Sequence, residues 1–296
     1  MGWNPESGKC IVSLLPGATE MVVAVGAEAQ LAGVSHECDW PDSVQHLPRV
    51  TTTPIDPTRT SAEIDRAVRD SVAAGRAVIG IDVATLRALA PTLIITQQLC
   101  DVCAVADGEA QRLATALADP PDVLVLQGTT LSGVWEDVRA VGVAVGRTVE
   151  ADLVAQELEL QVEALAARAT ERRPRVIAIE WLEPLFLAGH WVPEMIHAAG
   201  GIDVGAQPGD HSAQREWREL AALDPDVVLI MLCGFDEARA HRELAGMTNA
   251  AGRAWLAGRR VCVIDGNAYT SRPGPRLVEG ITLIQRFLHA GTAPHL

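Results

Sequence analysis

Short apolar runs alternate along the chain with longer segments whose apolar residues recur at helical spacing. Runs of four or five consecutive apolar residues are typical of strands that are buried on both faces of a parallel sheet. Such runs predict seven strands, at 11–15, 31–35, 93–96, 123–126, 176–179, 227–231 and 261–264. Because the segments between them are long enough for helices, the pattern predicts an α/β fold with mostly parallel sheets.

The segment 150–173 separates the first four predicted strands from the last three. Its apolar residues, Leu158 and Leu165 among them, recur at helical spacing, and no glycine or proline interrupts it before Pro174. The segment therefore predicts one long helix. We expect an N-terminal lobe at 1–148, a bridging helix at 149–173 and a C-terminal lobe at 174–296.

The two predicted lobes resemble each other. LRALAPTLIIT (86–96) matches LAALDPDVVLIM (220–231), since each reads as a helix end, a proline and then a strand. Further segments match in the same order around the first and the last strand of each lobe. We therefore predict two pseudo-symmetric α/β lobes, produced by a repeat and joined by the bridging helix. Ligands of parallel sheets bind beyond the carboxyl ends of the strands, so a cleft between the lobes is the expected site.

Composition and charge narrow the classes of partner. The chain of 296 residues has a formal net charge of -14, which argues against nucleic acid and anionic membranes. Its N-terminal segment has no basic region followed by a long apolar run, and no apolar run is long enough to span a bilayer. We therefore expect a cytoplasmic protein that binds a small molecule.

Polar residues cluster directly after the predicted strands. HECD (36–39) follows the second strand, and CDVC (100–103) follows the third. EWLEP (180–184), CGFD (233–236) and DGNAYTSRPGPR (265–276) follow strands of the second lobe. Because each cluster comes at the carboxyl end of its strand, all five are expected to face the same cleft.

Four of the six cysteines lie in these clusters, namely Cys38, Cys100, Cys103 and Cys233. Four thiolates can hold zinc, iron or an iron–sulfur cluster, and His36 is a further candidate ligand. A thioredoxin-like redox pair at Cys100 and Cys103 is one alternative, and plain packing of small side chains on neighbouring loops is another. A single C-x-x-C motif does not decide between these interpretations.

Other side chains in the clusters suit a flat ligand with polar groups. Trp181 and Trp191 offer planar apolar surface, and His190 lies next to Trp191 in the sequence. Tryptophan is also common in cores, so packing is the alternative for both. A proline-rich loop carries Arg272 and Arg276, which could hold a carboxylate, an amide or a phosphate. No G-x-S-x-G, Walker or G-x-G-x-x-G motif is present, and no set of residues demands catalysis.

Three segments resemble the family of periplasmic binding proteins for cobalamin, siderophores and haem: IVSLLPGATEMVVAVGAEAQLAGVSHECDWP (11–41), the helix at 150–173 and SRPGPRLVEG (271–280). The sequence is most similar to a leaderless cobalamin-binding branch, for which H-E-C-D-aromatic-P and L-C-x-V-C-A are characteristic. The resemblance covers residues 10–290. It implies two α/β lobes on one long backbone helix, with the ligand lying flat between them.

The resemblance also implies roles for single residues. Pro16 would line the cleft after the first strand. Glu37 and Trp40 fall where the transport members of the family place aromatic contacts. Tyr269 and Arg272 lie in a loop that corresponds to a ligand-contacting loop of the second lobe.

Transport members of the family carry in each lobe a surface glutamate that docks onto arginines of a membrane permease. The matching positions here are Ala84 and Arg218, so an ABC permease is not an expected partner. Two hypotheses follow. The first is a cytoplasmic binding protein for a corrinoid or a related metal chelate. The second is a metalloprotein or metalloenzyme that holds an iron–sulfur cluster, iron or zinc through the four cysteines.

Overall fold

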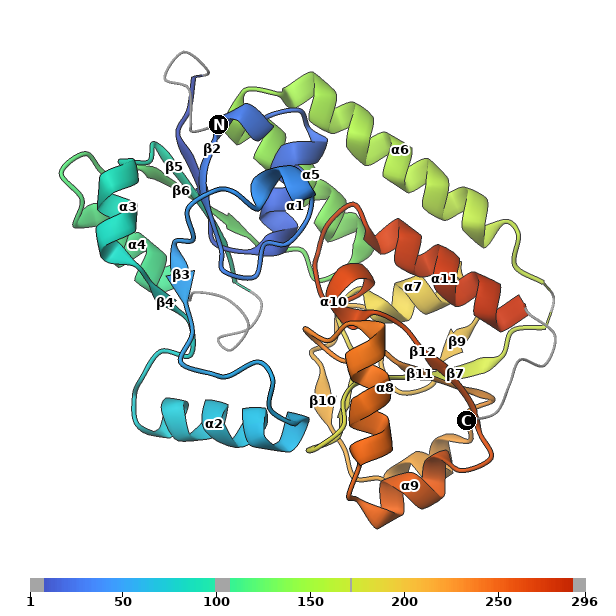
Figure 1. Cartoon of the computed structure of the whole chain (residues 1–296). Coiled ribbons are helices and arrows are strands. Elements are labelled where there is room, and N and C mark those ends of the chain that lie inside the picture. The colour runs from blue at the N-terminus through green and yellow to red at the C-terminus, as the bar shows by residue number, and fades with distance from the viewer. Residues whose placement is uncertain (1–7, 99–106, 171, 290–296) are drawn as a thin grey trace.

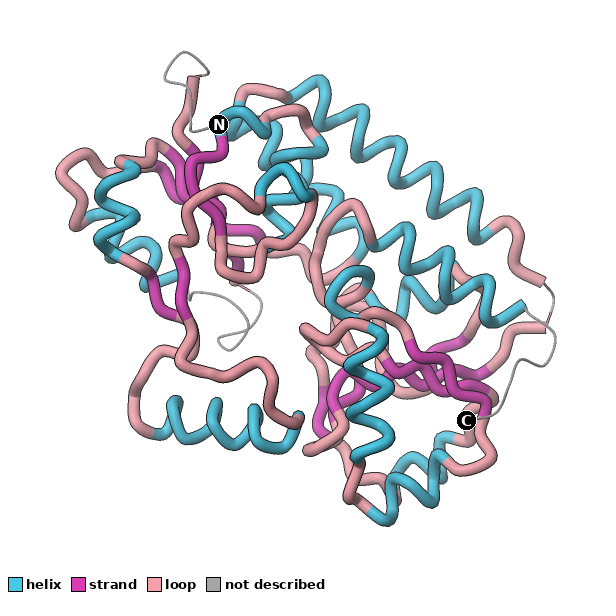
Figure 2. Tube along the Cα trace, viewed as in Figure 1, coloured by secondary structure: helices cyan, strands magenta, loops and turns pink. Residues whose placement is uncertain are grey.

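The computed structural model describes residues 8–98, 107–170 and 172–289 (Figure 1). It confirms the predicted α/β class with two lobes. Each lobe contains one mostly parallel sheet. Helices flank the strands of both lobes, as the cyan and magenta segments of Figure 2 show.

The N-terminal sheet has the strand order β2-β1-β5-β6, and all its strands are parallel. Its strands are β1 (Ile11–Ser13), β2 (Leu31–Val34), β5 (Leu93–Gln97) and β6 (Asp122–Leu126). One face packs on α1 (Pro16–Ala24) and α5 (Leu131–Val145), and the other on α3 (Val83–Leu89) and α4 (Asp107–Thr115). Ile11 and Val12 therefore enter two different core clusters, which explains why the strand is apolar at successive positions.

The C-terminal sheet has the order β10-β8-β7-β11-β12, with β9 beside β7. Its strands are β7 (Arg175–Trp181), β8 (Phe186–Leu187), β9 (Ile202–Asp203), β10 (Ala213–Gln214), β11 (Val227–Ile230) and β12 (Arg260–Val263). Its helices are α7 (Val192–Ala198) and α11 (Leu277–His289) on one face, α8 (Glu237–Gly246) and α9 (Ala250–Leu256) on the other, and α10 (Gly266–Tyr269) after β12. Three short 3-10 helices are η2 (Glu28–Gln30), η3 (Asp42–Val44) and η4 (Glu219–Leu223).

The long helix α6 (Thr148–Ala166) runs between the lobes along one side of the molecule (Figure 1). It ends before the predicted boundary at 173. The Thr170 hydroxyl donates to the carbonyl oxygen of Arg172, and Pro174 disfavours a helical residue before it. One apolar cluster extends from the N-terminal sheet through α5 and α6 to α7 and α11, so the two lobes share part of their core. Among the helices of the described ranges, none is both long and apolar enough to cross a membrane.

A smaller unit connects β2 to α3 and was not predicted. β3 (Thr51–Thr52) pairs antiparallel with β4 (Gly80–Ile81), and α2 (Ser61–Ala73) projects between them towards the C-terminal lobe (Figure 1). We call residues 53–79 the α2 arm. Its helix begins with a capping box in which Thr60 and Glu63 each bond the other's backbone N–H. The arm has little apolar surface, so the apolar pattern gave no signal for it.

Candidate functional site

Arg272 connects the two lobes. It lies in the loop after α10, is only 6% exposed, and donates to both carboxylate oxygens of Asp39 at 2.5 and 3.1 Å. It also donates to the carbonyl oxygen of Glu37 at 3.1 Å and to the side-chain oxygen of Asn267 at 2.8 Å. Asp39 and Glu37 follow β2 of the N-terminal lobe. The two-pronged ion pair therefore fixes one lobe against the other.

Glu20, a buried residue of α1, lies next to this ion pair. Its Oε1 atom is 3.5 Å from Nη1 of Arg272 and 3.9 Å from Nη1 of Arg276, and neither carboxylate oxygen has a well-formed hydrogen bond. Burial raises the pKa of Glu20 to about 7, although Arg272 and Arg276 oppose the rise. Burial acts in the same direction on Asp39, but the hydrogen bonds and charge of Arg272 hold the pKa of that carboxyl below its ordinary value. The network therefore contains one carboxyl that titrates near neutral pH and one that stays ionised.

Arg276 lies between two aromatic rings. Its guanidinium carbon is 4.8 Å from the ring centroid of Trp40 and 4.8 Å from that of Tyr269. Trp40 is 46% exposed. Glu37 is exposed as well, and desolvation by the surrounding protein raises the pKa of its carboxyl. We call Glu37, Trp40, Tyr269 and Arg276 the interlobe recess.

The interlobe recess combines aromatic surface with one guanidinium and one carboxyl group. Sites for small molecules are lined mainly by apolar and aromatic side chains, with a few polar groups that set the orientation of the ligand. An exposed tryptophan over an arginine gives such a site a flat, weakly polar wall. The recess can therefore hold a planar ligand with polar groups at its edge.

The backbone at the start of α1 lies in close contact with the backbone of the loop that carries Arg272 and Arg276. A Cβ atom on Gly17 would lie 2.2 Å from the carbonyl oxygen of Pro273. Gly17 is in the first turn of α1, and Pro273 is in the loop of Arg272 and Arg276. Glycine at this position therefore lets the two lobes approach closely enough for the ion pairs to form.

We predict that Gly17→Ala lowers the free energy of unfolding by about 1–3 kcal/mol, because the added methyl group must displace backbone rather than a side chain. Urea denaturation of the full chain measures the change. Gly108→Ala is the matched control, since nothing lies within 4 Å of a Cβ at that position. If Gly17→Ala had the same free energy of unfolding as the wild type, the loop of Pro273 could move away from α1 without loss of stability, which would contradict the prediction.

Two of the predicted metal ligands make other contacts. Cys38 is 1% exposed and shares a hydrogen bond of 3.1 Å with Thr19, and burial raises the pKa of its thiol to about 11, which disfavours a thiolate. The His36 ring bonds the Thr51 hydroxyl through Nδ1 at 2.6 Å. Among residues 8–98, 107–170 and 172–289, no three His, Cys, Asp or Glu side chains are grouped so that they could hold a metal ion.

The C-x-x-C pair falls outside that part of the chain. Cys100 and Cys103 are not among the described residues, and Cys233 is a partly exposed free cysteine after β11. Binding of an iron–sulfur cluster, iron or zinc by the four cysteines therefore stays a prediction.

Two of the predicted ligand contacts are buried. Trp191 is 5% exposed, and its indole N–H donates to the carbonyl oxygen of Thr270 at 2.8 Å. Pro16, the first residue of α1, is buried too. In this structure, the apolar surfaces of both side chains are removed from water by packing. Trp181 is partly exposed and packs edge-on against Phe235, with the ring centroids 5.4 Å apart.

His190 lies near a second contact between the lobes. It has a positive φ of 53°, and its backbone N–H donates to the carbonyl oxygen of Asp210 at 2.6 Å. Its ring faces His211 edge-on at 5.3 Å, and burial, together with the charge of His211, lowers its pKa. Nearby, the backbone N–H of Leu131 in the first lobe donates to Glu194 of α7 at 2.6 Å. His190 is partly exposed and stays a candidate ligand residue.

The acidic partners of the arginine loop were not predicted. Arg272 and Arg276 were expected to hold a carboxylate, an amide or a phosphate, and Glu20 and Asp39 of the same chain supply the carboxylates that face them. An acidic HECD loop after a strand of one lobe and an arginine loop after a strand of the other were the available signal. Opposite charges at strand ends that face the same cleft would have predicted an ion pair between the lobes.

Comparison with known proteins agrees with this architecture. The family described as periplasmic binding protein matches residues 11–253. A periplasmic haem-binding protein from Pseudomonas aeruginosa is 19% identical, with a TM-score of 0.70 over 97% of this chain and 94% of that chain. The vitamin B12-binding protein BtuF of Vibrio cholerae is 19% identical, with a TM-score of 0.66 over 94% and 95% of the two chains. The haem-binding protein RhuT from Roseiflexus sp. RS-1 is 22% identical, with a TM-score of 0.67 over 95% and 98%.

A search of curated proteins found no match to the chain. At identities of 19–22%, the similarity to solved structures shows the fold alone. The family match is independent of that similarity and spans most of the sequence. With its two lobes, its long connecting helix and this match, the chain belongs to the periplasmic binding protein family.

Proposed function

We propose that this protein binds a corrinoid of the cobalamin type in the interlobe region. The family supports a binding role for a small molecule. One structural neighbour is titled a vitamin B12-binding protein and others are titled haem-binding proteins, so planar metal chelates are the ligand class that the comparisons suggest.

The observation that carries the proposal is the interlobe recess. Trp40 is one of few large apolar side chains that the described residues leave exposed, and it does not lie on the outer helices but beside Arg276 and Tyr269 between the lobes. An exposed tryptophan gains free energy when a flat ligand covers it. Glu37, three residues before Trp40 in the same loop, is exposed and offers a hydrogen-bonding group for the edge of the ligand.

Charge at the recess favours a corrinoid over a haem. Glu37 and Asp39 supply two exposed carboxyl groups at this end of the interlobe region and Glu20 a buried one, while Arg272 is already bonded to Asp39 and Arg276 is the guanidinium of the recess. Haem carries propionate carboxylates, which these acidic side chains would repel. A corrin ring carries amide side chains, which donate and accept hydrogen bonds without adding charge. The net charge of -14 acts in the same direction, because it repels an anionic ligand.

We also propose that binding takes place in the cytoplasm and without an ABC permease. The positions that align with the docking glutamates of transport members are Ala84 in α3 and Arg218 before η4, and neither can form an ion pair with an arginine. Fractionation of cells that express the chain from its own gene tests the location. Recovery in the periplasmic or membrane fraction would contradict it.

We predict that the wild type binds cyanocobalamin and that Trp40→Ala weakens the affinity by about tenfold or more, as expected for loss of an aromatic anchor. Trp40→Phe, which keeps a flat ring, should retain most of the affinity. Titration calorimetry and the corrinoid absorption spectrum retained through gel filtration are the measurements, with haemin as the competing chelate. Tighter binding of haemin than of cyanocobalamin would refute the corrinoid assignment, and binding of neither would refute the proposed function.

A further inference from the structure

The α2 arm forms a second connection between the lobes. Figure 1 shows α2 and α6 on opposite sides of the region between the lobes. α6 joins the lobes covalently, whereas the arm leaves the N-terminal lobe at β3, reaches the C-terminal lobe at the start of α2, and returns at β4. At the tip of the arm, residues 59–61 contact α8 through hydrogen bonds. Unlike the covalent connection through α6, these contacts can break and form again.

The tip of the arm is attached to α8 by hydrogen bonds to one carboxylate. The backbone N–H of Ser61 donates to Oε1 of Glu243 at 2.7 Å, and the Ser61 hydroxyl donates to the same oxygen at 2.5 Å. One turn earlier on α8, Arg239 donates to the carbonyl oxygen of Arg59 at 3.0 Å. Ser61 is 1% exposed although both its neighbours on the arm are more open, so this contact is well formed.

Most apolar contacts of the arm are with the N-terminal lobe. Val78 and Ile79 are buried in a core cluster of that lobe, and Ile55 and Val68 pack against it, whereas Ile64 packs against the core cluster of the C-terminal lobe. Of the thirteen residues of α2, only Ser61 and Ser71 are buried. A helix with so little buried apolar surface is held in place mainly by its polar contacts, and such an element is expected to open locally at low free-energy cost.

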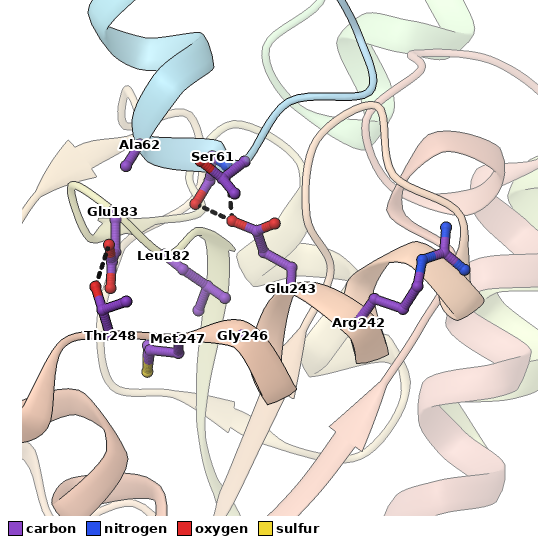
Figure 3. Close-up of a pocket in the computed structure, with 10 residues that line it drawn as sticks. Ser61, Ala62, Leu182, Glu183, Arg242, Glu243, Gly246, Met247 and Thr248 are labelled. Carbon is purple, nitrogen blue, oxygen red and sulfur yellow. Dashed lines mark hydrogen bonds between the residues drawn. The ribbon is translucent and has the colours of Figure 1, made fainter.

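The joint between arm and lobe is incompletely filled. A pocket of about 180 Å³ lies between the tip of the arm and the C-terminal lobe (Figure 3). Figure 3 shows Ser61 bonded to Glu243 on one side, and Glu183 with Thr248 on the other. The pocket is smaller than the 300–1,000 Å³ usual for a site that encloses an organic ligand, so it is a gap in the joint and not the ligand site. Because this gap leaves the arm and the C-terminal lobe incompletely packed against each other, the two can separate with the loss of few van der Waals contacts.

We propose that the α2 arm is a latch that controls entry of the ligand to the interlobe region, with Glu243 as the positioning residue that holds it shut. The inference rests on the proposed function, because it concerns access to the same site. Closing of the arm joins the lobes on the side opposite α6. Opening requires the loss of the Ser61–Glu243 and Arg59–Arg239 contacts, the separation of Asp56 from the charge of Arg239, and the withdrawal of Ile64.

The first test needs no ligand. Hydrogen exchange of the full chain should show faster exchange of the α2 amides in Glu243→Ala and in Ser61→Ala than in the wild type, by about tenfold, the effect expected when hydrogen bonds to a charged group are lost. Glu237→Ala is the matched control, since Glu237 is an exposed acid on the same helix and touches no residue of the arm. Unchanged exchange in both arm variants would overturn the latch, whether or not a ligand is known.

The second test measures access. Stopped-flow mixing with cyanocobalamin should give a higher association rate and a higher dissociation rate in Glu243→Ala, with a smaller change in affinity, because a gate affects both directions. A double variant with Ser61→Ala should add little, since both changes remove the same contact. Faster exchange of α2 with unchanged rates would overturn the role in access. If the wild type binds no cyanocobalamin, the proposed function fails, and hydrogen exchange still decides whether the arm opens.

Discussion

Replacing Arg272 by alanine is expected to lower the free energy of unfolding by about 1.5–3 kcal/mol, the range for loss of hydrogen bonds to a charged group, because the guanidinium is buried although the Asp39 side chain is 55% exposed. The guanidinium is 6% exposed and is bonded to Asp39, to the carbonyl oxygen of Glu37 and to Asn267. Its loss leaves Glu20 buried with Arg276 as its remaining positive neighbour, at 3.9 Å. Chemical denaturation followed by circular dichroism measures the change.

Arg139→Ala is the matched control for Arg272→Ala. Arg139 also faces three carboxylates, Glu136, Asp152 and Glu159, but its side chain is 23% exposed and its partners are 40–71% exposed. Surface pairs contribute about 0–1 kcal/mol, so this variant should lose far less stability. Arg272→Lys, which keeps the charge but not the two-pronged geometry, should fall between the two. Equal losses for Arg272→Ala and Arg139→Ala would show that the interlobe pair adds nothing beyond a surface pair.

Glu20→Gln is expected to make the protein more stable than the wild type at about pH 8, and to lose that advantage at about pH 5. Burial raises the pKa of Glu20 to about 7 from its ordinary value of 4.5. The folded state therefore holds a proton that the unfolded state releases as the pH rises from about 4.5. The stability associated with that proton is fully present below the unfolded pKa and is lost as the pH rises through the folded pKa.

The size of the pH effect follows from the pKa shift. One pKa unit corresponds to about 1.4 kcal/mol, so the difference between Glu20→Gln and the wild type should change by up to about 3 kcal/mol across this interval. The groups that face Glu20 are Arg272, Arg276 and Asp39, and they are present in both proteins, so the difference isolates Glu20. Thermal or urea unfolding at both pH values measures it. Glu163→Gln, at an exposed position of α6, removes the same charge away from the arginine network and is the matched control.

Several features of the fold could be read from local sequence. Continuous apolar runs such as 93–96 and 227–231 identified buried strands, because a strand covered on both faces has no solvent side that would alternate. The segment 150–173 identified the connecting helix but not its end, since α6 ends at Ala166 and no glycine or proline before Pro174 marks that end in the sequence. β3, β4 and the α2 arm were missed because they are short or mainly polar.

The candidate site was only partly predictable. Trp40 and Tyr269 were named from a resemblance and lie together in the recess, on either side of Arg276. Pro16 was named from the same resemblance and Trp191 from its flat apolar side chain, and both are buried. Whether an aromatic side chain after a strand faces the core or the space between the lobes depends on the path of the loop, and no local pattern encodes that path.

By itself, the sequence determined the seven longer strands, where the long helix begins and which polar clusters stand at the strand ends, because apolar periodicity is a local property that burial imposes on the chain. Tertiary structure alone decided which of those clusters meet. It paired Arg272 with Asp39 across 233 positions and Ser61 with Glu243 across 182. It also raised the pKa of Glu20, because burial and neighbouring charges depend on side chains that come together only when both lobes have folded.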